Sequence, residues 1–226
     1  SDELQDTMSG GGASMAMHES QSRFFENIVG RSRQFWERHY PVLREHFREE
    51  LADVTLDDFL RYINHVGTGL VRTEADELTY PLHVLIRYEI EKDMMAGRVT
   101  EENVEEVWNA KYKEYLGVDV PDAGVGVAQD MHWYSGEFGY FPTYALGSAY
   151  GAQMLAAMKR DFDADSAMGD EDISAIAAWL KEHIHKYGAS RSPAAIFEAA
   201  CGAPFDAHFY IDYLKEKYAS LNGIAL

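Results

Sequence analysis

The spacing of apolar side chains predicts helices along almost the whole of this 226-residue chain. Between residues 15 and about 39 they recur every three or four residues, which places them on one face of an α-helix. This stripe consists of Phe25, Val29, Ser32 and Trp36, with Phe24, Ile28 and Phe35 beside it. The alternation of apolar and polar residues that marks a β-strand is nearly absent. The sequence therefore predicts an all-α, multi-helical fold.

Glycine, proline and helix-capping residues divide the chain into segments. Helices are expected at 15–39, 42–51, 56–66, 73–96, from Thr100 to about 116, from 142 through 158, and at 171–186, 193–200 and 205–221. Pro81 predicts a kink within the fourth of these. Residues 1–14 are expected to form a mobile lead-in to a helical region over 15–226. Loops are expected at 117–126, at 161–170 and in the glycine- and aromatic-rich segment 129–141.

Charge and composition exclude several kinds of partner. The net charge of −18 argues against nucleic acid and anionic membrane surfaces, because both repel an acidic protein. No apolar run is long enough to cross a membrane. Cys201 is the one cysteine and is expected in the core, so the sequence predicts no disulfide and a reducing, cytoplasmic location.

Glu19 is the first candidate for metal binding. Its carboxylate can coordinate a divalent cation, but the neighbouring His18 points about 100° away on a helix, so the two cannot share one ion. Catalytic zinc needs three protein ligands. The sequence contains no His-Glu-x-x-His motif. Glu19 is therefore interpreted as one ligand of a site whose other ligands lie elsewhere.

Four polar residues form a row on the helix expected at 73–96. At about 100° per residue, Asp76, Tyr80, His83 and Arg87 fall within roughly 60° of one another. A phenol, an imidazole, a guanidinium and a carboxylate in one row indicate either a pocket wall or a buried polar network. A surface stripe with internal ion pairs is the alternative.

Further candidates lie outside this row. Arg72 can bind a carboxylate through two parallel hydrogen bonds, or can form an ordinary surface ion pair. His132 stands in the glycine-aromatic segment as either a functional or a structural histidine. Tyr140 and Tyr144 flank the start of the helix at 142, where a phenol can donate to a developing oxyanion or simply pack in the core.

Five segments give the chain a resemblance to a known family. They are HESQSR at 18–23, VRTEADELTY at 71–80, IRYEIE at 86–91, GVAQDMHW at 126–133 and GEFGYFPTYALG at 136–147. In this order they resemble the C-terminal part of the carboxypeptidase Taq family of zinc metallocarboxypeptidases. The resemblance covers essentially the whole chain.

This resemblance implies a fold, a metal and partners. The family fold is almost wholly helical, has a deep substrate groove and is usually dimeric, so a homodimer is expected. Zinc, or cobalt, is expected to be bound by two histidines of a His-Glu-x-x-His helix and by Glu19. The glutamate of that helix would be the general base on metal-bound water.

The resemblance also assigns roles to residues of this chain. Arg72 matches the residue expected to hold the C-terminal carboxylate of a peptide substrate. His132 and Tyr144 match residues thought to stabilise the tetrahedral intermediate. Tyr140 is placed with these catalytic residues, and Arg87 and Tyr80 with the substrate-binding ones.

The missing His-Glu-x-x-His helix limits what this chain is expected to do alone. We predict the C-terminal part of a carboxypeptidase that removes single residues from peptide C-termini and needs the N-terminal part of the same protein as its partner. Alone, the chain is expected to be inactive and to bind zinc weakly or not at all. The alternative is a non-catalytic helical association module that retains a relic peptide pocket.

Overall fold

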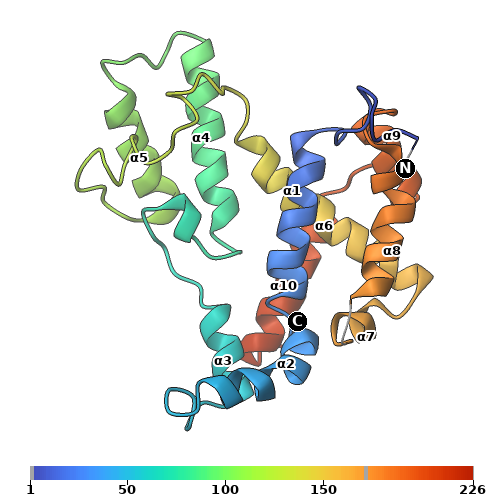
Figure 1. Cartoon of the computed structure of the whole chain (residues 1–226). Helices are drawn as coiled ribbons and strands as arrows, with labels where there is room; N and C mark the ends of the chain where they lie inside the picture. Colours follow the sequence, from blue (N-terminus) through green and yellow to red (C-terminus); the bar gives the residue numbers. More distant parts are fainter. Residues whose placement is uncertain (1–2, 171–172, 226) are drawn as a thin grey trace. The chain divides into compact units, whose positions relative to one another are not determined.

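A computed structural model describes residues 3–170 and 173–225, and this part of the chain contains no β-strand. The elements are α1 (Met15–Arg23), the π-helical turn η1 (Phe24–Val29), α2 (Arg33–His46), α3 (Leu56–Ile63), the 3₁₀ turn η2 (Arg72–Glu74), α4 (Tyr80–Met95), α5 (Val104–Leu116), α6 (Pro142–Asp161), α7 (Ala164–Met168), α8 (Ser174–His183), the 3₁₀ turn η3 (His185–Tyr187), α9 (Pro193–Cys201) and α10 (His208–Asn222) (Figure 1). The all-α prediction is confirmed.

The chain divides into two compact units. The first consists of Ser1–Asn64 and Leu146–Leu226, and the second of His65–Ala145. The first unit has one large apolar core, to which α1, η1, α6, α8 and α9 contribute. Its fully buried members include Phe24, Met154, Met158, Ile176, Leu180 and Phe197.

A close helix crossing at Gly147 organises the first unit. A Cβ atom on Gly147 of α6 would lie 2.6 Å from the Cβ and 2.7 Å from the carbonyl carbon of Glu19 on α1. Side chains do not tolerate such distances, so only glycine allows the two helices to approach here. One turn further along α6, a Cβ on Gly151 would meet Ile28 at an ordinary 3.4 Å.

The second unit is built on α4 and α5, which pack side by side (Figure 1). Ile86 and Ile90 of α4 pack with Trp108 and Tyr112 of α5 in a buried cluster. A second cluster joins Tyr80 and Val84 of α4 to Phe141, Trp133 and Tyr144 of the chain that leads into α6. The segment at 129–141 lies on this cluster and contains no regular helix, as expected.

The helix expected at 15–39 is interrupted, so that prediction is wrong in its middle. The helix widens into the π-turn η1 and ends at Gly30. Ser32 then adopts an extended backbone, and its hydroxyl accepts a hydrogen bond from Phe35 N, so it is the N-cap of α2 and not part of an apolar stripe. α2 runs through Pro41 to His46, short of the expected end at 51.

The start of α4 also differs from the prediction, because Asp76 lies before the helix. Its Oδ1 accepts hydrogen bonds from the backbone N–H groups of Leu78 and Thr79, both at 2.9 Å. This side chain satisfies amides that a helix through 73–79 would have used, so α4 begins only at Tyr80. Pro81 therefore stands in the first turn, where it is well tolerated, and the predicted mid-helix kink is wrong.

Smaller differences concern helix ends and loops. α3 has the expected cap at Thr55, in a reciprocal capping box with Asp58, but ends at Ile63. The loop expected at 161–170 contains the short helix α7. In the proposed lead-in at 1–14, the carbonyl oxygen of Ser9 accepts a hydrogen bond from Ala189 N at 2.9 Å. The mobility of this lead-in stays a prediction. The expected helix start at 171 lies outside the described residues.

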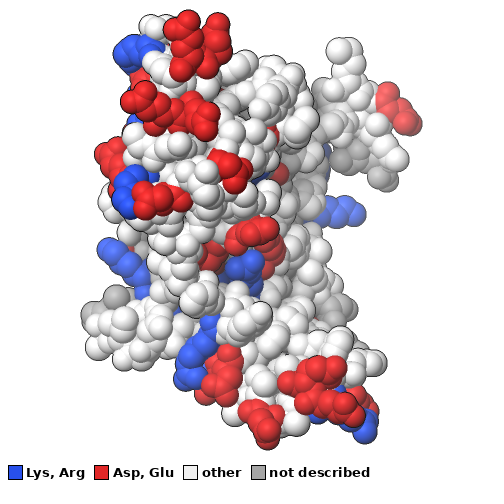
Figure 2. Space-filling view, turned by 90° about the vertical axis from the view of Figure 1, so that its left-hand side faces the viewer, with Lys and Arg blue, Asp and Glu red and all other residues white. Residues whose placement is uncertain are grey.

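The surface agrees with an acidic protein. Figure 2 shows Asp and Glu side chains spread over one face, with Lys and Arg side chains lying among them. None of the helices within residues 3–170 and 173–225 combines the length and apolarity needed to span a membrane. Cys201 is buried in the core as predicted, and burial raises the pKa of its thiol to about 12.

We expect Gly147→Ala to destabilise the protein, although alanine favours a helix interior by about 1 kcal/mol. The added methyl group would overlap Glu19, and overpacking of this kind costs about 1–3 kcal/mol. Gly151→Ala on the same helix is the matched control and should be neutral or stabilising, because its methyl group has room. Urea unfolding measures both; equal stabilities of the two variants would contradict the close crossing.

Candidate functional site

One carboxylate joins the two arginines of the second unit. Asp130 Oδ1 accepts hydrogen bonds from Nη2 and Nε of Arg72, at 2.6 and 3.2 Å. Asp130 Oδ2 accepts one from Nε of Arg87 at 2.6 Å. The side chains of Arg72, Arg87 and Asp130 are 6%, 0% and 11% exposed. Tyr80, His83 and Arg87 of the predicted row thus belong to a buried polar network and not to a surface stripe, whereas Asp76 lies before α4 and binds Gly67, Leu78 and Thr79.

Neutral groups complete this network. Gln129 Oε1 accepts from Arg72 N at 2.9 Å and from Arg87 Nη2 at 2.8 Å. Arg72 Nη1 donates to the Tyr80 hydroxyl at 2.8 Å. Arg87 Nη1 donates to the Tyr112 hydroxyl and to the carbonyl oxygen of His83, at 3.2 and 2.8 Å.

Aromatic rings surround the two guanidinium groups. The Arg72 guanidinium lies 4.6 Å from the Tyr144 ring centre and 5.6 Å from that of Phe141. The Arg87 guanidinium lies 4.6 Å from the Trp108 ring centre. Ring faces attract cations, so these contacts favour charged arginines in an interior that would otherwise disfavour them.

Burial and charge set the protonation states. Burial opposes the charge of Arg72, but the hydrogen bond to Asp130 and the favourable electrostatic interactions with Tyr80, Asp130 and Tyr144 together outweigh burial and raise the pKa of Arg72. Burial also opposes ionisation of Asp130, yet hydrogen bonds and charges of both arginines lower its pKa. Burial, reinforced by the charges of Arg87 and Arg72, lowers the pKa of His83 to about 4. At neutral pH this network therefore holds two cations, one anion and a neutral imidazole.

His132 and Tyr144 form a hydrogen-bonded pair beside this network. His132 Nε2 lies 2.8 Å from the Tyr144 hydroxyl oxygen. The other ring nitrogen, Nδ1, is buried without a hydrogen-bond partner among the described residues and lies 3.9 Å from Asp130 Oδ1. Burial and the charge of Arg72 lower the pKa of His132, which favours the neutral ring.

A neutral imidazole and a phenol have two protons between them, and their mutual hydrogen bond uses one. If Tyr144 donates to Nε2, the second proton sits on Nδ1 and faces Asp130. If Nε2 donates to Tyr144, the phenol keeps its own proton for another acceptor. The tautomer of His132 therefore determines whether the Tyr144 hydroxyl donates to this imidazole or to another acceptor.

The remaining predicted residue of this unit, Tyr140, lies next to the pair. Its ring centre is 5.3 Å from that of His132 and 5.4 Å from that of Tyr144. The second unit thus brings together Arg72, Tyr80, Arg87, His132, Tyr140 and Tyr144, and the roles predicted for them stay predictions.

Glu19 lies in the first unit, on α1, and is half-buried. Its Oε2 accepts a hydrogen bond from the Ser22 hydroxyl at 3.1 Å. The neighbouring His18 is exposed, and its ring lies against Gly12. Across residues 3–170 and 173–225, His, Cys, Asp and Glu side chains do not gather into a group of three that could hold a metal ion. The residues present do not by themselves fit a zinc site.

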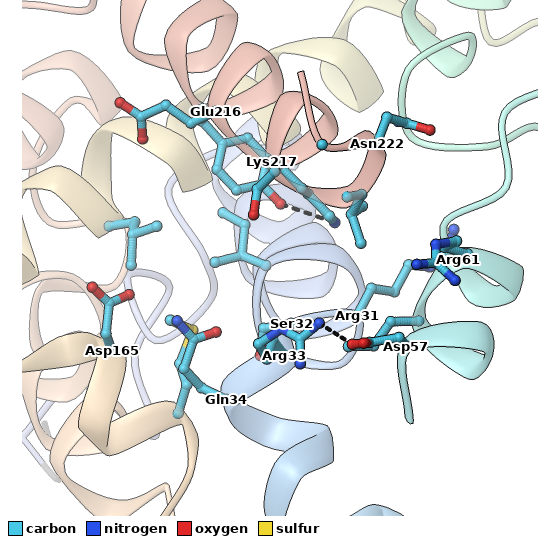
Figure 3. A pocket seen from close by; sticks show the side chains of 18 of the residues that line it. Arg31, Ser32, Arg33, Gln34, Asp57, Arg61, Asp165, Glu216, Lys217 and Asn222 are labelled. Carbon is cyan, nitrogen blue, oxygen red and sulfur yellow. Dashed lines mark hydrogen bonds and ion pairs between the residues drawn. The ribbon is translucent and has the colours of Figure 1, made fainter. Parts of the chain in front are cut away.

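The first unit also contains a cavity of about 660 Å³. Its charged lining residues come from α2, α3, α6, α7, α10 and the turn before α2 (Figure 3). Two of the lining cations pair with carboxylates: Arg33 with Asp57, and Lys159 with Asp165 at 2.9 Å. Its lining includes none of the predicted site residues.

Sequence reasoning missed three residues that hold the second unit's network together. Asp130 and Gln129 bind both arginines, and Glu91 of α4 binds the segment at 129–141 through Trp133 and Gly139. All three lie inside the segments that carry the family resemblance. Periodicity could not find them, because their partners lie 42 to 58 residues away along the chain.

Comparisons with known proteins agree with this fold. The crystal structure of an M32 carboxypeptidase from Deinococcus radiodurans R1 matches with a TM-score of 0.91 and 39% identity, covering 95% of this chain and 44% of that one. Carboxypeptidase 1 of Bacillus subtilis is 43% identical over 211 residues, which are 93% of this chain and 42% of that protein. Thermostable carboxypeptidase 1 of Thermus thermophilus is 41% identical over 218 residues, again 42% of its length.

The fold is therefore that of part of a helical metallopeptidase. A family model described as carboxypeptidase Taq (M32) metallopeptidase matches residues 1–218, and the chain belongs to this family. It spans 42% of the length of the curated relatives that it matches, as the resemblance to a C-terminal part predicts.

We expect acid to destabilise the second unit through His83. The folded pKa of about 4 lies below the ordinary 6.5, so between these values the unfolded chain binds a proton that the folded chain does not. Stability should fall as the pH drops through this window, by about 3 kcal/mol in total. His83→Asn keeps a polar group near Tyr112 but does not titrate, and should show a shallower fall. Urea unfolding at pH 7.5 and 4.5 measures this; parallel curves would contradict it.

Proposed function

We propose that this chain is the C-terminal part of a metal-dependent carboxypeptidase that removes single residues from the C-termini of peptides. The observation that carries the proposal is the guanidinium of Arg72, held rigidly beside the His132–Tyr144 pair. Membership of the carboxypeptidase Taq family supports it.

Arg72 is suited to receive a substrate carboxylate. Three of its five side-chain N–H groups form hydrogen bonds: the one on Nε and one on Nη2 donate to Asp130, and one on Nη1 donates to Tyr80. The described residues give the other two no hydrogen-bond partner. A guanidinium fixed in this way loses little freedom when it binds a carboxylate. In this proposal Tyr80 and Arg87 support substrate binding by holding Arg72 and Asp130.

His132 and Tyr144 would act on the oxygen of the scissile carbonyl group. With Nε2–H directed at Tyr144, the phenol would donate its proton to the developing oxyanion, and the imidazole would stabilise the charge that builds on the phenol oxygen. Tyr140 would contribute its ring beside this pair. Glu19 would supply one carboxylate ligand to zinc or cobalt, and the other ligands would come from outside this chain.

Arg72→Ala in the full-length enzyme should raise KM for peptides by about 10- to 100-fold, because a charge-assisted hydrogen bond contributes about 1.5–3 kcal/mol. The value of kcat should change less. Binding of a C-terminally amidated peptide should be nearly unchanged, since it lacks the carboxylate that Arg72 would hold. A variant that processes free peptides like the wild type would exclude this role.

The purified 226-residue chain should hydrolyse no peptide bond and should bind zinc weakly or not at all, since Glu19 is a single ligand and catalytic zinc takes three from the protein. Adding the N-terminal part that carries the His-Glu-x-x-His helix should restore zinc binding and activity. In the complex of the two parts, Glu19→Gln should lower the affinity for zinc, measured by calorimetry. Cleavage by the isolated chain, lost in Glu19→Gln, would refute the prediction, and a complex that stays inactive would favour a non-catalytic association module.

A further inference from the structure

Glu91 is a buried carboxylate that no step of the proposed function uses. It lies on α4 and is 5% exposed. Its Oε1 accepts a hydrogen bond from Trp133 Nε1 at 2.8 Å, and its Oε2 accepts one from Gly139 N at 3.1 Å. Both donors belong to the irregular segment at 129–141. A single side chain of α4 therefore binds this segment at two points.

The two points enclose an exposed loop tip. Residues 134–138 lie between them, and the side chains of Tyr134 and Phe138 are 67% and 47% exposed. Within the tip, backbone hydrogen bonds run from Glu137 N to His132 O at 2.8 Å and from Gly136 N to Trp133 O at 3.1 Å, whereas the two exposed rings add little packing. Gly139 has a φ of +81°, a left-handed conformation that only glycine adopts readily, and its N–H reaches Glu91 from there. The carboxylate thus closes the base of the loop.

The residues next to these two points are members of the proposed site. His132 directly precedes Trp133, and Tyr140 directly follows Gly139. Their ring centres lie 5.3 Å apart. We propose that Glu91 is a positioning residue that fixes His132 and Tyr140 relative to each other by binding the backbone and indole beside them. The proposal rests on the proposed function, in which these two residues act on the substrate.

Other contacts keep this part of the unit folded when the carboxylate is removed. The Trp133 ring packs edge-on against Trp108 and Phe141, each with centres 5.9 Å apart. On the other side of His132, Asp130 remains bound to both arginines. Loss of Glu91 should therefore loosen the loop between 133 and 139 while the unit stays folded.

Steady-state kinetics of the full-length enzyme test the proposal. Glu91→Ala should lower kcat by roughly 10- to 100-fold, the effect of a misplacement of catalytic groups of about 1 Å, and should change KM little. Glu91→Gln should recover much of the loss, because its amide oxygen still accepts from the Trp133 indole. The matched control is Glu89→Ala on the same helix, which removes a carboxylate bound by Lys111 and Tyr115 of α5. It should behave like the wild type.

Hydrogen exchange of the Trp133 indole N–H in the 226-residue chain gives a second measurement, with Trp133→Phe to assign the signal. Exchange should be faster in Glu91→Ala and unchanged in Glu89→Ala. If the wild type is active and Glu91→Ala has the same kcat, the role of Glu91 is overturned. An equal loss of kcat in Glu89→Ala would overturn it too. A full-length wild type without peptidase activity would instead overturn the proposed function, while the exchange rates would still report whether Glu91 holds the loop.

Discussion

Two arginines share one buried carboxylate, and the second unit is arranged around Asp130. Burying an ion costs several kcal/mol, and the cost is recovered only where partners are close and well oriented. Asp130 meets this condition for Arg72 and Arg87 at once, with three contacts of 2.6 to 3.2 Å. The arrangement joins the turn before α4, α4 itself and the segment at 129–141. Removing the carboxylate would leave two cations buried without their anion.

The same carboxylate connects packing to chemistry. Asp130 is two residues from His132, and its Oδ1 is 3.9 Å from the imidazole Nδ1. A proton on Nδ1 would be attracted by this anion and would leave Nε2 to accept from Tyr144. Donation from Tyr144 to a substrate oxygen requires the opposite tautomer. The site would thus have to exchange a proton position when a charged oxygen develops, so the pair would act as a unit and not as two independent donors.

The sequence predicted most helices but few of the interactions that decide where they begin. Periodicity reveals an apolar face, but it cannot show that the side chains of Ser32 and Asp76 bind backbone amides. These hydrogen bonds determine where α2 and α4 begin. For the candidate site, likewise, the sequence predicted several residues but not their hydrogen-bond partners. Helix spacing grouped Tyr80 with Arg87, and the glycine-aromatic segment with the following helix start indicated His132, Tyr140 and Tyr144, whose roles came from the family resemblance. The partners of the arginines were not predictable, because a helical pattern contains no information about a loop 43 residues away.

The burial pattern of α4 shows why the sequence alone did not predict the contacts of its arginine. Its polar residues His83 and Arg87 are fully buried, whereas Leu85 is 36% exposed. Val84, Ile86 and Ile90 are buried as well, so polar and apolar side chains of α4 are buried together, whereas a simple amphipathic helix keeps its polar side chains exposed. Here the hydrogen bonds that Arg87 donates to Asp130, Gln129 and Tyr112 offset the exposure of a leucine, whose burial would contribute only about 2 kcal/mol. A guanidinium without those partners could not be buried at all, so the orientation of α4 follows from residues that meet it only in the folded chain. The burial of Arg87, on which the candidate site depends, is therefore also the feature of α4 that an apolar pattern alone does not predict.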